Sequence, residues 1–374
     1  MNASEKTSNV AQKVLARNIP SLDGLRAASI LLVILAHCGW YLPNEIHDSV
    51  VFRSIVGSGR NGVAVFFVIS GYLITSLLRR EFEKTQTISL KHFYFRRSLR
   101  IFPPFYFLLA VMGILWAVGW IPQDWPSFLA SATYTWALDP KATGYFIGHS
   151  WSLSIEELFY LFWPLAFLIG HKRQRAMEVA AGLILLMPVI RLALYFITPA
   201  ARGHEEYMVQ GWVDTMMVGC TLALLKGEPR WERIHRRFIH GWSAAAMAVI
   251  GFLVAPVLLI VLPKFLSSLF GLVLKPFLLA ACIGGILVYV VENSESLAGR
   301  ILNASLVRHI GVMSYSLYLW QQLFTSYLLP MLPIGLFYAF AAAEFSYWVV
   351  ERPSLSLRAR LERKQNASPI TQTT

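Results

Sequence analysis

Charged residues are scarce in this chain: Asp, Glu, Lys and Arg make up 14% of its 374 residues, whereas hydrophobic residues make up 56%. So little charge excludes a large soluble domain beside the apolar segments. The chain has only three cysteines, Cys38, Cys220 and Cys282, and all of them fall inside apolar segments. Their spacing excludes a disulfide framework and a cysteine-based metal site. We therefore expect an all-α integral membrane protein that uses no metal.

Long apolar runs make up most of the chain. Ten of them are long enough to cross a bilayer, since a spanning helix needs about 20 residues. They cover residues 25–42, 60–78, 101–119, 152–170, 177–197, 208–225, 240–262, 270–291, 310–329 and 333–350. We therefore expect a bundle of about ten transmembrane helices. A weaker apolar stretch, Trp125–Leu138, predicts a re-entrant or surface helix.

The net charge of +12 would suit a nucleic-acid-binding protein, but its distribution indicates membrane topology instead. With ten spans, 26 of the 33 Lys and Arg residues fall on one side, and Arg191 falls within a span. Cytoplasmic loops carry the excess of Lys and Arg, so we expect both termini in the cytoplasm and no nucleic-acid partner. The polar ends, 1–18 and 354–374, are then a flexible cytoplasmic N-terminus and a cytoplasmic polar tail. The six basic residues on the outer side are Arg53, Arg60, Lys141, Arg202, Lys264 and Lys275.

Arg26 and His37 are the two strongly polar residues of the first apolar segment. An ionisable group inside a membrane is costly, so its presence calls for a reason. The two residues are eleven positions apart, which is about 16 Å along a helix. With Arg26 at the cytoplasmic face, His37 lies in the outer half. It is either a structural histidine hydrogen-bonded between helices or a general base, because imidazole suits proton transfer near neutral pH.

Arg97 and Arg100 are three residues apart in F-Y-F-R-R-S-L-R-I-F-P-P, so they share one face of a helix. They fall at the cytoplasmic end of the segment 101–119. Two interpretations are open. The pair anchors lipid headgroups, or it binds the phosphates of a phosphorylated donor, since guanidinium groups match phosphate oxygens.

The stretch Gly148–Pro164 enters its apolar segment from the outside and contains adjacent carboxylates, Glu156 and Glu157. Helix capping accounts for one carboxylate and leaves the other to face the bundle interior. We expect Glu156 at a depth comparable with His37, where it could orient the imidazole or balance its charge. His149 lies at the same mouth, where an interfacial role competes with a functional one.

An isolated aspartate inside an apolar segment, Asp214, needs a partner, either Arg191 or Arg26, so that a structural ion pair is favoured. The two late segments place Gln321 and Gln322 where they could bind a hydroxylated acceptor. The full set of candidate substrate-binding residues is Asp23, His149, Trp151, Asp214, Tyr318 and Glu344.

Taken together and in this order, five motifs resemble the acyltransferase-3 family of membrane O-acyltransferases. They are D-G-L-R-A with a histidine eleven residues after its arginine, F-F-V-I-S-G-Y-L-I, the R-x-x-R of Arg97 and Arg100, W-S-L-S-I-E-E-L-F-Y, and S-Y-S-L-Y-L-W. The resemblance covers residues 19–353, which it identifies as a transmembrane acyltransferase domain. One position departs from the pattern, because Gln321 stands where many relatives carry histidine.

The resemblance implies transfer of an acyl group, usually acetyl, from cytoplasmic acyl-coenzyme A to a hydroxyl. The expected acceptor is a glycan or glycosylated molecule at the outer side of a bacterial inner membrane. The resemblance makes Arg26 and His37 the essential pair and Arg97 and Arg100 the donor-binding pair. Glu156 is a third catalytic candidate. We expect a standalone enzyme whose partners are the bilayer and a carbohydrate.

A polytopic transporter or flippase for a lipid-linked sugar is the alternative. Ten spans, intramembrane charges and a net charge of +12 would suit it equally. Its function would not specifically need His37 together with a cytoplasmic pair of arginines, which is why we favour the enzyme.

Overall fold

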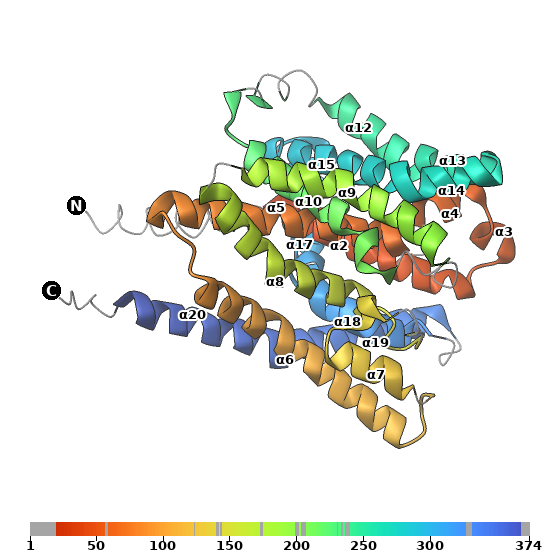
Figure 1. Ribbon diagram of the computed structural model, residues 1–374. Coiled ribbons are helices and arrows are strands. Elements are labelled where there is room, and N and C mark those ends of the chain that lie inside the picture. The colour runs from red at the N-terminus through yellow and green to blue at the C-terminus, as the bar shows by residue number, and fades with distance from the viewer. Residues whose placement is uncertain are drawn as a thin grey trace.

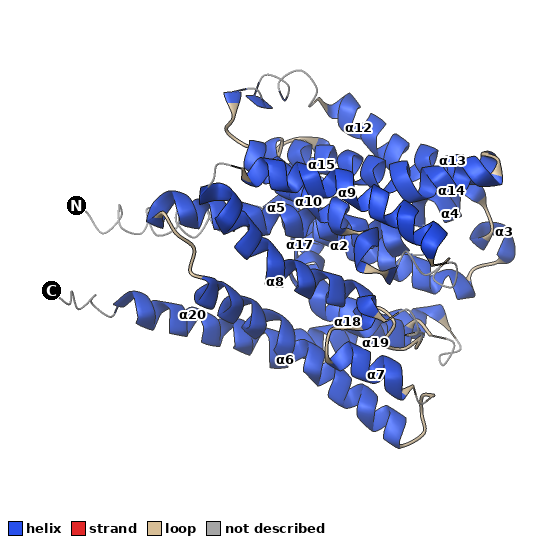
Figure 2. Cartoon of the chain, in the orientation of Figure 1, coloured by secondary structure: helices blue, strands red, loops and turns tan. Residues whose placement is uncertain are grey.

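The computed structural model describes residues 20–367 apart from 57–58, 123, 140–141, 143, 173–174, 199–201, 203–206, 230, 233–234, 236–239 and 327–330. Every regular element in these described residues is a helix, as Figure 2 shows, which confirms the expected all-α class. Helices suit an apolar chain in a bilayer, because lipid offers the backbone no hydrogen-bond partners. The expected flexible segment 1–18 lies outside the described residues.

The order of the helices along the chain can be followed in Figure 1. Three of them contain a π-helical turn, labelled η7, η8 or η9, between two α-helical parts. In chain order the elements are α2 (Pro20–His37), η1 (Cys38–Tyr41), α3 (Asn44–His47), α4 (Val50–Val56), α5 (Arg60–Thr85), α6 (Leu90–Ala117), α7 (Trp125–Ala132), η3 (Trp136–Leu138), α8 (Ser150–Lys172), α9 (Ala176–Ile197), η6 (Val209–Gly211), α10 (Val213–Leu225), α12 (Gly241–Val249), η7 (Ile250–Val254), α13 (Ala255–Val261), α14 (Lys264–Leu269), η8 (Phe270–Leu274), α15 (Lys275–Glu292), α16 (Leu297–Leu302), α17 (Ser305–Val312), α18 (Ser314–Phe324), α19 (Leu332–Ser346), η9 (Tyr347–Glu351) and α20 (Arg352–Ala367).

Seven helices of the described chain are long and apolar enough to cross a membrane. The expectation of about ten spans is therefore met in part. Two of the remaining segments form shorter helices, because α10 begins only after a turn at Val209–Gly211 and the segment 310–329 is divided at Met313 between α17 and α18. The seven are Val50–Thr85, Leu90–Ala117, Ser150–His171, Ala176–Ile197, Gly241–Val261, Lys264–Glu292 and Leu332–Glu362.

The centre of the bundle is built on a close contact between α5 and α10. Gly71 of α5 lies against the backbone of Met216, and Gly219 of α10 lies against the backbone of Val68, so a side chain larger than hydrogen would collide at either position. Small residues allow this approach in membrane helices. The contact matters for the site because α5 lines both cavities described below.

The stretch Trp125–Leu138, which predicted a re-entrant or surface helix, forms the short helix α7 and the turn η3. The ring of Trp125 lies 5.1 Å from that of Trp116 in α6, and it is largely exposed. Residues 354–367 of the expected polar tail lie in α20, which continues the helix of α19 and runs along α6 in Figure 1. Residues 368–374 lie outside the described part of the chain.

Candidate active site

A cavity enters the described bundle at the start of α2, and we call it the arginine cavity. Its volume is about 710 Å³. Arg26 of α2 and the pair Arg97 and Arg100 at the start of α6 line it. Arg358 of α20 also lines this cavity, so the first and last described helices meet here.

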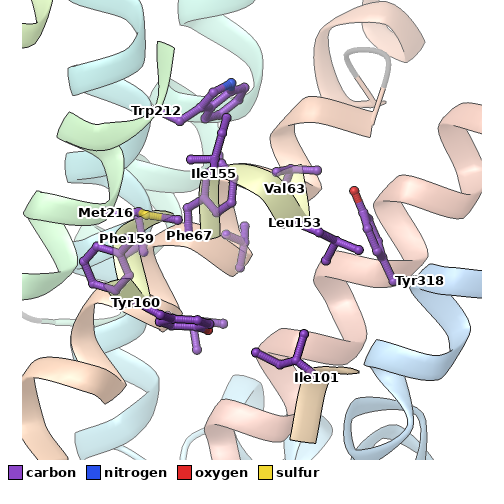
Figure 3. Packing of buried hydrophobic residues seen from close by; sticks show 14 of the residues in the cluster. Val63, Phe67, Ile101, Leu153, Ile155, Phe159, Tyr160, Trp212, Met216 and Tyr318 are labelled. Carbon is purple, nitrogen blue, oxygen red and sulfur yellow. The ribbon is translucent and has the colours of Figure 1, made fainter. Parts of the chain in front are cut away.

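A second cavity, of about 940 Å³, enters at the other end of α2, and we call it the histidine cavity. His37, at the end of α2, and His149 and Trp151, at the start of α8, line it. Val63 of α5 and Tyr318 of α18 line both cavities, so the two meet at these side chains. Figure 3 shows both residues among the buried hydrophobic side chains at this level of the bundle.

The guanidinium groups of the arginine cavity are held by neighbours on their own and adjacent helices. Arg26 Nη1 lies 3.9 Å from Oδ1 of Asp23, one turn earlier on α2. The guanidinium of Arg97 lies 4.9 Å from the ring centroid of Tyr160. Arg97 and Arg100 line the same cavity, which confirms that their spacing puts them on one helix face. Such a cluster can bind phosphate oxygens through paired hydrogen bonds.

Carboxylates share this cavity with the arginines. Asp23, Glu81, Glu156 and Glu362 line it, and Arg96 Nη2 lies 3.3 Å from Oε2 of Glu81. The arginine cavity therefore carries charges of both signs.

Glu156 points into the arginine cavity. Its Oε1 accepts a hydrogen bond from Ser70 Oγ at 2.6 Å and another from the hydroxyl of Tyr160. The expectation that Glu156 lies beside His37 is wrong, because His37 lines the other cavity. The reason is depth: α8 begins at the histidine cavity, and Glu156 lies six residues, about 9 Å, further along its axis.

The histidine at the end of α2 has a defined tautomer. Nδ1 of His37 lies 2.9 Å from the carbonyl oxygen of Val33. A carbonyl only accepts, so Nδ1 carries the hydrogen and Nε2 of the neutral ring is free to accept a proton. Gly59, with φ of +80°, packs against the same ring, and a Cβ at that position would lie 3.8 Å from Cε1 of His37.

His149, which the sequence left between an interfacial and a functional role, is buried with 3% of its surface exposed. Its Nδ1 lies 2.8 Å from Oε1 of Gln322, and its backbone N–H donates to the same oxygen at 3.1 Å. The amide nitrogen of Gln322 donates to the carbonyl of Tyr145 at 2.5 Å, so the amide oxygen faces the ring. Nδ1 of His149 is therefore the donor. Its Nε2 is buried without a partner among the described residues.

Burial also decides the charge of His149. It lowers the pKa of His149 to about 4, so the ring is neutral at physiological pH. The histidine cavity therefore holds two imidazoles, His37 and His149, each with Nδ1 bonded to a carbonyl or amide oxygen and Nε2 left as the acceptor.

Tyr318, one of the substrate-binding candidates, lies at the junction of the two cavities. Its Oη lies 2.5 Å from Oγ of Ser152 and 3.2 Å from the carbonyl oxygen of His149. Trp151 lines the histidine cavity, and its ring lies 5.5 Å from that of Trp212. Asp23, a further candidate, lines the arginine cavity instead.

The structure removes two residues from the substrate-binding candidates. Asp214 is fully buried, and its Oδ2 accepts a hydrogen bond from Nη2 of Arg191 at 2.7 Å, which confirms the structural ion pair and excludes a cavity position. Glu344 lines neither cavity, because its oxygens bind Nε2 of His309 at 2.5 Å and Nε1 of Trp348 at 2.9 Å on the outside of the bundle.

Sequence reasoning missed two partners of Glu156. Tyr160 lies four residues after it on α8, a spacing that brings side chains together on a helix and could have indicated the contact. Ser70 comes from α5, 86 residues earlier, and no local pattern connects the two. The next residue, Gly71, has a different role, because it packs against the backbone of Met216.

Comparison with known proteins bears on the chemistry of these cavities. The chain is 29% identical to a peptidoglycan O-acetyltransferase of Listeria monocytogenes over 368 residues, which is 90% of this chain and 55% of the relative. It is 28% identical to a candidate peptidoglycan O-acetyltransferase of Bacillus subtilis, with the same coverage. It is 27% identical to a candidate O-acetyltransferase of Staphylococcus aureus, over 93% of this chain and 59% of the relative.

The chain thus spans a little over half the length of these curated relatives. No solved structure matches it. A family model described as an acyltransferase domain matches residues 19–350, which include the described lining of both cavities and their junction, apart from Arg358 and Glu362 of the arginine cavity. The chain therefore belongs to the acyltransferase-3 family, and this membership favours the enzyme over the transporter.

Proposed function

We propose that this chain is a membrane O-acetyltransferase with a donor site on one side and an acceptor site on the other. It takes an acetyl group from cytoplasmic acetyl-coenzyme A and transfers it to a hydroxyl of a glycan or glycosylated acceptor outside a bacterial inner membrane. The observation that carries this proposal is the meeting of the arginine and histidine cavities at Val63 and Tyr318.

The arginine cavity is the donor site. Arg97 and Arg100 bind the phosphates of the donor, because two guanidinium groups on one helix face can bind several phosphate oxygens at once. Arg26 lies deeper on α2 and faces the arm that carries the thioester. Eleven residues separate it from His37, about 16 Å along the helix, so the arm extends from one cavity to the other.

Transfer takes place on the histidine side of the junction. Nε2 of His37 accepts the proton of the acceptor hydroxyl while the oxygen attacks the thioester carbonyl carbon. The carbon–sulfur bond breaks, its electrons remain on sulfur, and the sulfur takes the proton held by His37. Nε2 of His149 accepts a hydrogen bond from a neighbouring hydroxyl and so orients the acceptor.

The bundle is oriented with the arginine cavity facing the cytoplasm. The excess of Lys and Arg supports this orientation. Asp23 of α2 and Arg358 of α20 line the same cavity, which supports the placement of both termini on one side of the membrane. With α2, α10 and the pair α17 and α18 added to the seven long helices, the chain crosses the membrane ten times and both termini are cytoplasmic.

The test is acetyl transfer by the purified protein in lipid nanodiscs, with labelled acetyl-coenzyme A and peptidoglycan fragments as acceptors. We expect label on the glycan with the wild type and none with His37→Gln. The matched control is His309→Gln, which removes a histidine paired with Glu344 outside both cavities. Transfer that survives in His37→Gln, or that stops equally in His309→Gln, would contradict the proposal.

A further inference from the structure

The described Asp, Glu, Lys and Arg residues that line the histidine cavity are all basic. Arg53, Arg60 and Lys275 line it, and no Asp or Glu occurs among its described lining residues. Three of the six basic residues that the sequence places on the outer side are thus gathered at one cavity. The arginine cavity differs, since carboxylates lie among its arginines.

Lys275 places a positive charge within an apolar helix, where an unpaired charge is energetically unfavourable. The sequence counts Lys275 among the outer basic residues, and it lies eleven residues into the continuous apolar helix Lys264–Glu292, about 16 Å from its start. Its ammonium group has no hydrogen bond or ion pair with the described residues, and its side chain is half-buried. Ionisable residues at such depth are costly and mark functional sites.

Arg60 is a second cation that lines the same cavity as Lys275. The two residues repel each other electrostatically, and the guanidinium of Arg60 lies 5.6 Å from the ring centroid of Tyr207. Two like charges in a partly desolvated cavity are unfavourable unless an anion lies between them. Ser54 Oγ, which is buried without a partner among the described residues, also faces this cavity and can donate to such an anion.

We propose that the histidine cavity binds its acceptor through an anionic group, a phosphate or carboxylate on the glycan, held between Arg60 and Lys275. The hydroxyl to be acetylated then lies against His37. This inference rests on the proposed function and narrows its substrate class to acidic acceptors. The exposed side chain of Arg53, at the rim, draws such acceptors toward the cavity.

The first experiment compares acceptors. Three glycans of equal length serve as probes: a neutral oligomer, one with a sugar carboxylate, and one with a terminal diphosphate. We expect the wild type to have a lower KM for at least one acidic acceptor. Lys275→Gln should raise that KM roughly 10- to 100-fold, as loss of one charge-assisted contact does, with little change in kcat or in use of the neutral glycan.

The matched control is Lys264→Gln, which removes the same charge from the exposed start of the same helical run. It should leave the KM unchanged. Equal KM values for neutral and acidic acceptors in the wild type, or an equal effect of Lys264→Gln and Lys275→Gln, would overturn the proposal. Preference for the carboxylate or for the diphosphate identifies which anion the site takes.

A second measurement separates this proposal from the proposed function. Inorganic diphosphate should raise the thermal unfolding midpoint of an Arg97→Ala/Arg100→Ala variant, whose arginine cavity lacks the proposed phosphate-binding pair. Adding Arg60→Gln or Lys275→Gln should abolish that shift. If the wild type transfers no acetyl group but this shift is present, the anion site stands and the proposed function fails. Absence of the shift, together with equal KM values, refutes the anion site.

Discussion

Nδ1 of His37 lies 2.9 Å from the carbonyl oxygen of Val33, one helical turn earlier in α2. This bond leaves Nε2 as the atom that accepts a proton. We predict that His37→Gln lowers turnover about 10²- to 10⁴-fold, the range expected for loss of a general base. The unfolding midpoint should change little, since the imidazole bonds only to its own helix among the described residues. Stopped-time assays and thermal unfolding measure the two effects.

The same variant distinguishes two forms of catalysis. If His37 carried the acyl group covalently, the wild type would retain labelled acetyl after denaturation when no acceptor is present. We expect no retained label, because a base holds only a proton. Near-normal turnover in His37→Gln would show that the histidine is structural.

The variants Gln321→Leu and Gln322→Leu, at neighbouring positions of α18, should change the stability of the protein in opposite directions. Gln322 orients His149 through its amide oxygen, so Gln322→Leu should lower both stability and acetyl transfer. Gln321 is fully buried, and both of its amide atoms lack partners among the described residues. Gln321→Leu should therefore raise stability by about 1–3 kcal/mol. Thermal unfolding compares the two variants, and equal shifts would refute the assignment.

Removal of Arg97 and Arg100 together should weaken donor binding while the protein still inserts. Each charge-assisted contact contributes about 1.5–3 kcal/mol, or roughly one to two decades of affinity. Calorimetric titration with acetyl-coenzyme A measures the loss in the double alanine variant. The control is Arg175→Ala, an arginine paired with Glu178 on the surface. Unchanged affinity in the double variant would leave lipid-headgroup anchoring as the role of the pair.

The ion pair between Arg191 and Asp214 should matter for folding and not for acceptor binding. Asp214→Asn leaves the buried guanidinium without its counter-charge, which should cost about 3–5 kcal/mol. The double variant Arg191→Met/Asp214→Leu should lose less, because it buries no unpaired charge. Thermal unfolding tests the stability, and acceptor KM should be unchanged. A raised KM would return Asp214 to the substrate-binding residues.

Both termini should lie in the cytoplasm. Reporter fusions at Met1 and Thr374 that respond to the compartment test this directly. Fusions in opposite compartments would mean an odd number of crossings, with α7 and η3 as the first candidates for the additional one.

The sequence candidates other than Asp214 and Glu344 line the two cavities, but Glu156 does not share a cavity with His37. Arg26 and His37 were correctly assigned to opposite ends of one helix because the rise per residue is constant. The hydrogen bond between Ser70 and Glu156 could not be inferred, because the sequence does not show how far α8 is shifted along α5. Lys275 was counted on the outer side although it falls within the segment 270–291, and the sequence does not show that α14, η8 and α15 form one helix around it.

The junction of the cavities has a consequence for the permeability of the membrane. Val63 and Tyr318 line both cavities, so under the proposed orientation these side chains separate the cavity on the cytoplasmic side from the cavity on the outer side. The tyrosine is held in place by Ser152 and by the backbone of His149. Under the proposed function, this anchored ring blocks proton leakage between the two cavities while each turnover passes an acetyl group from one to the other.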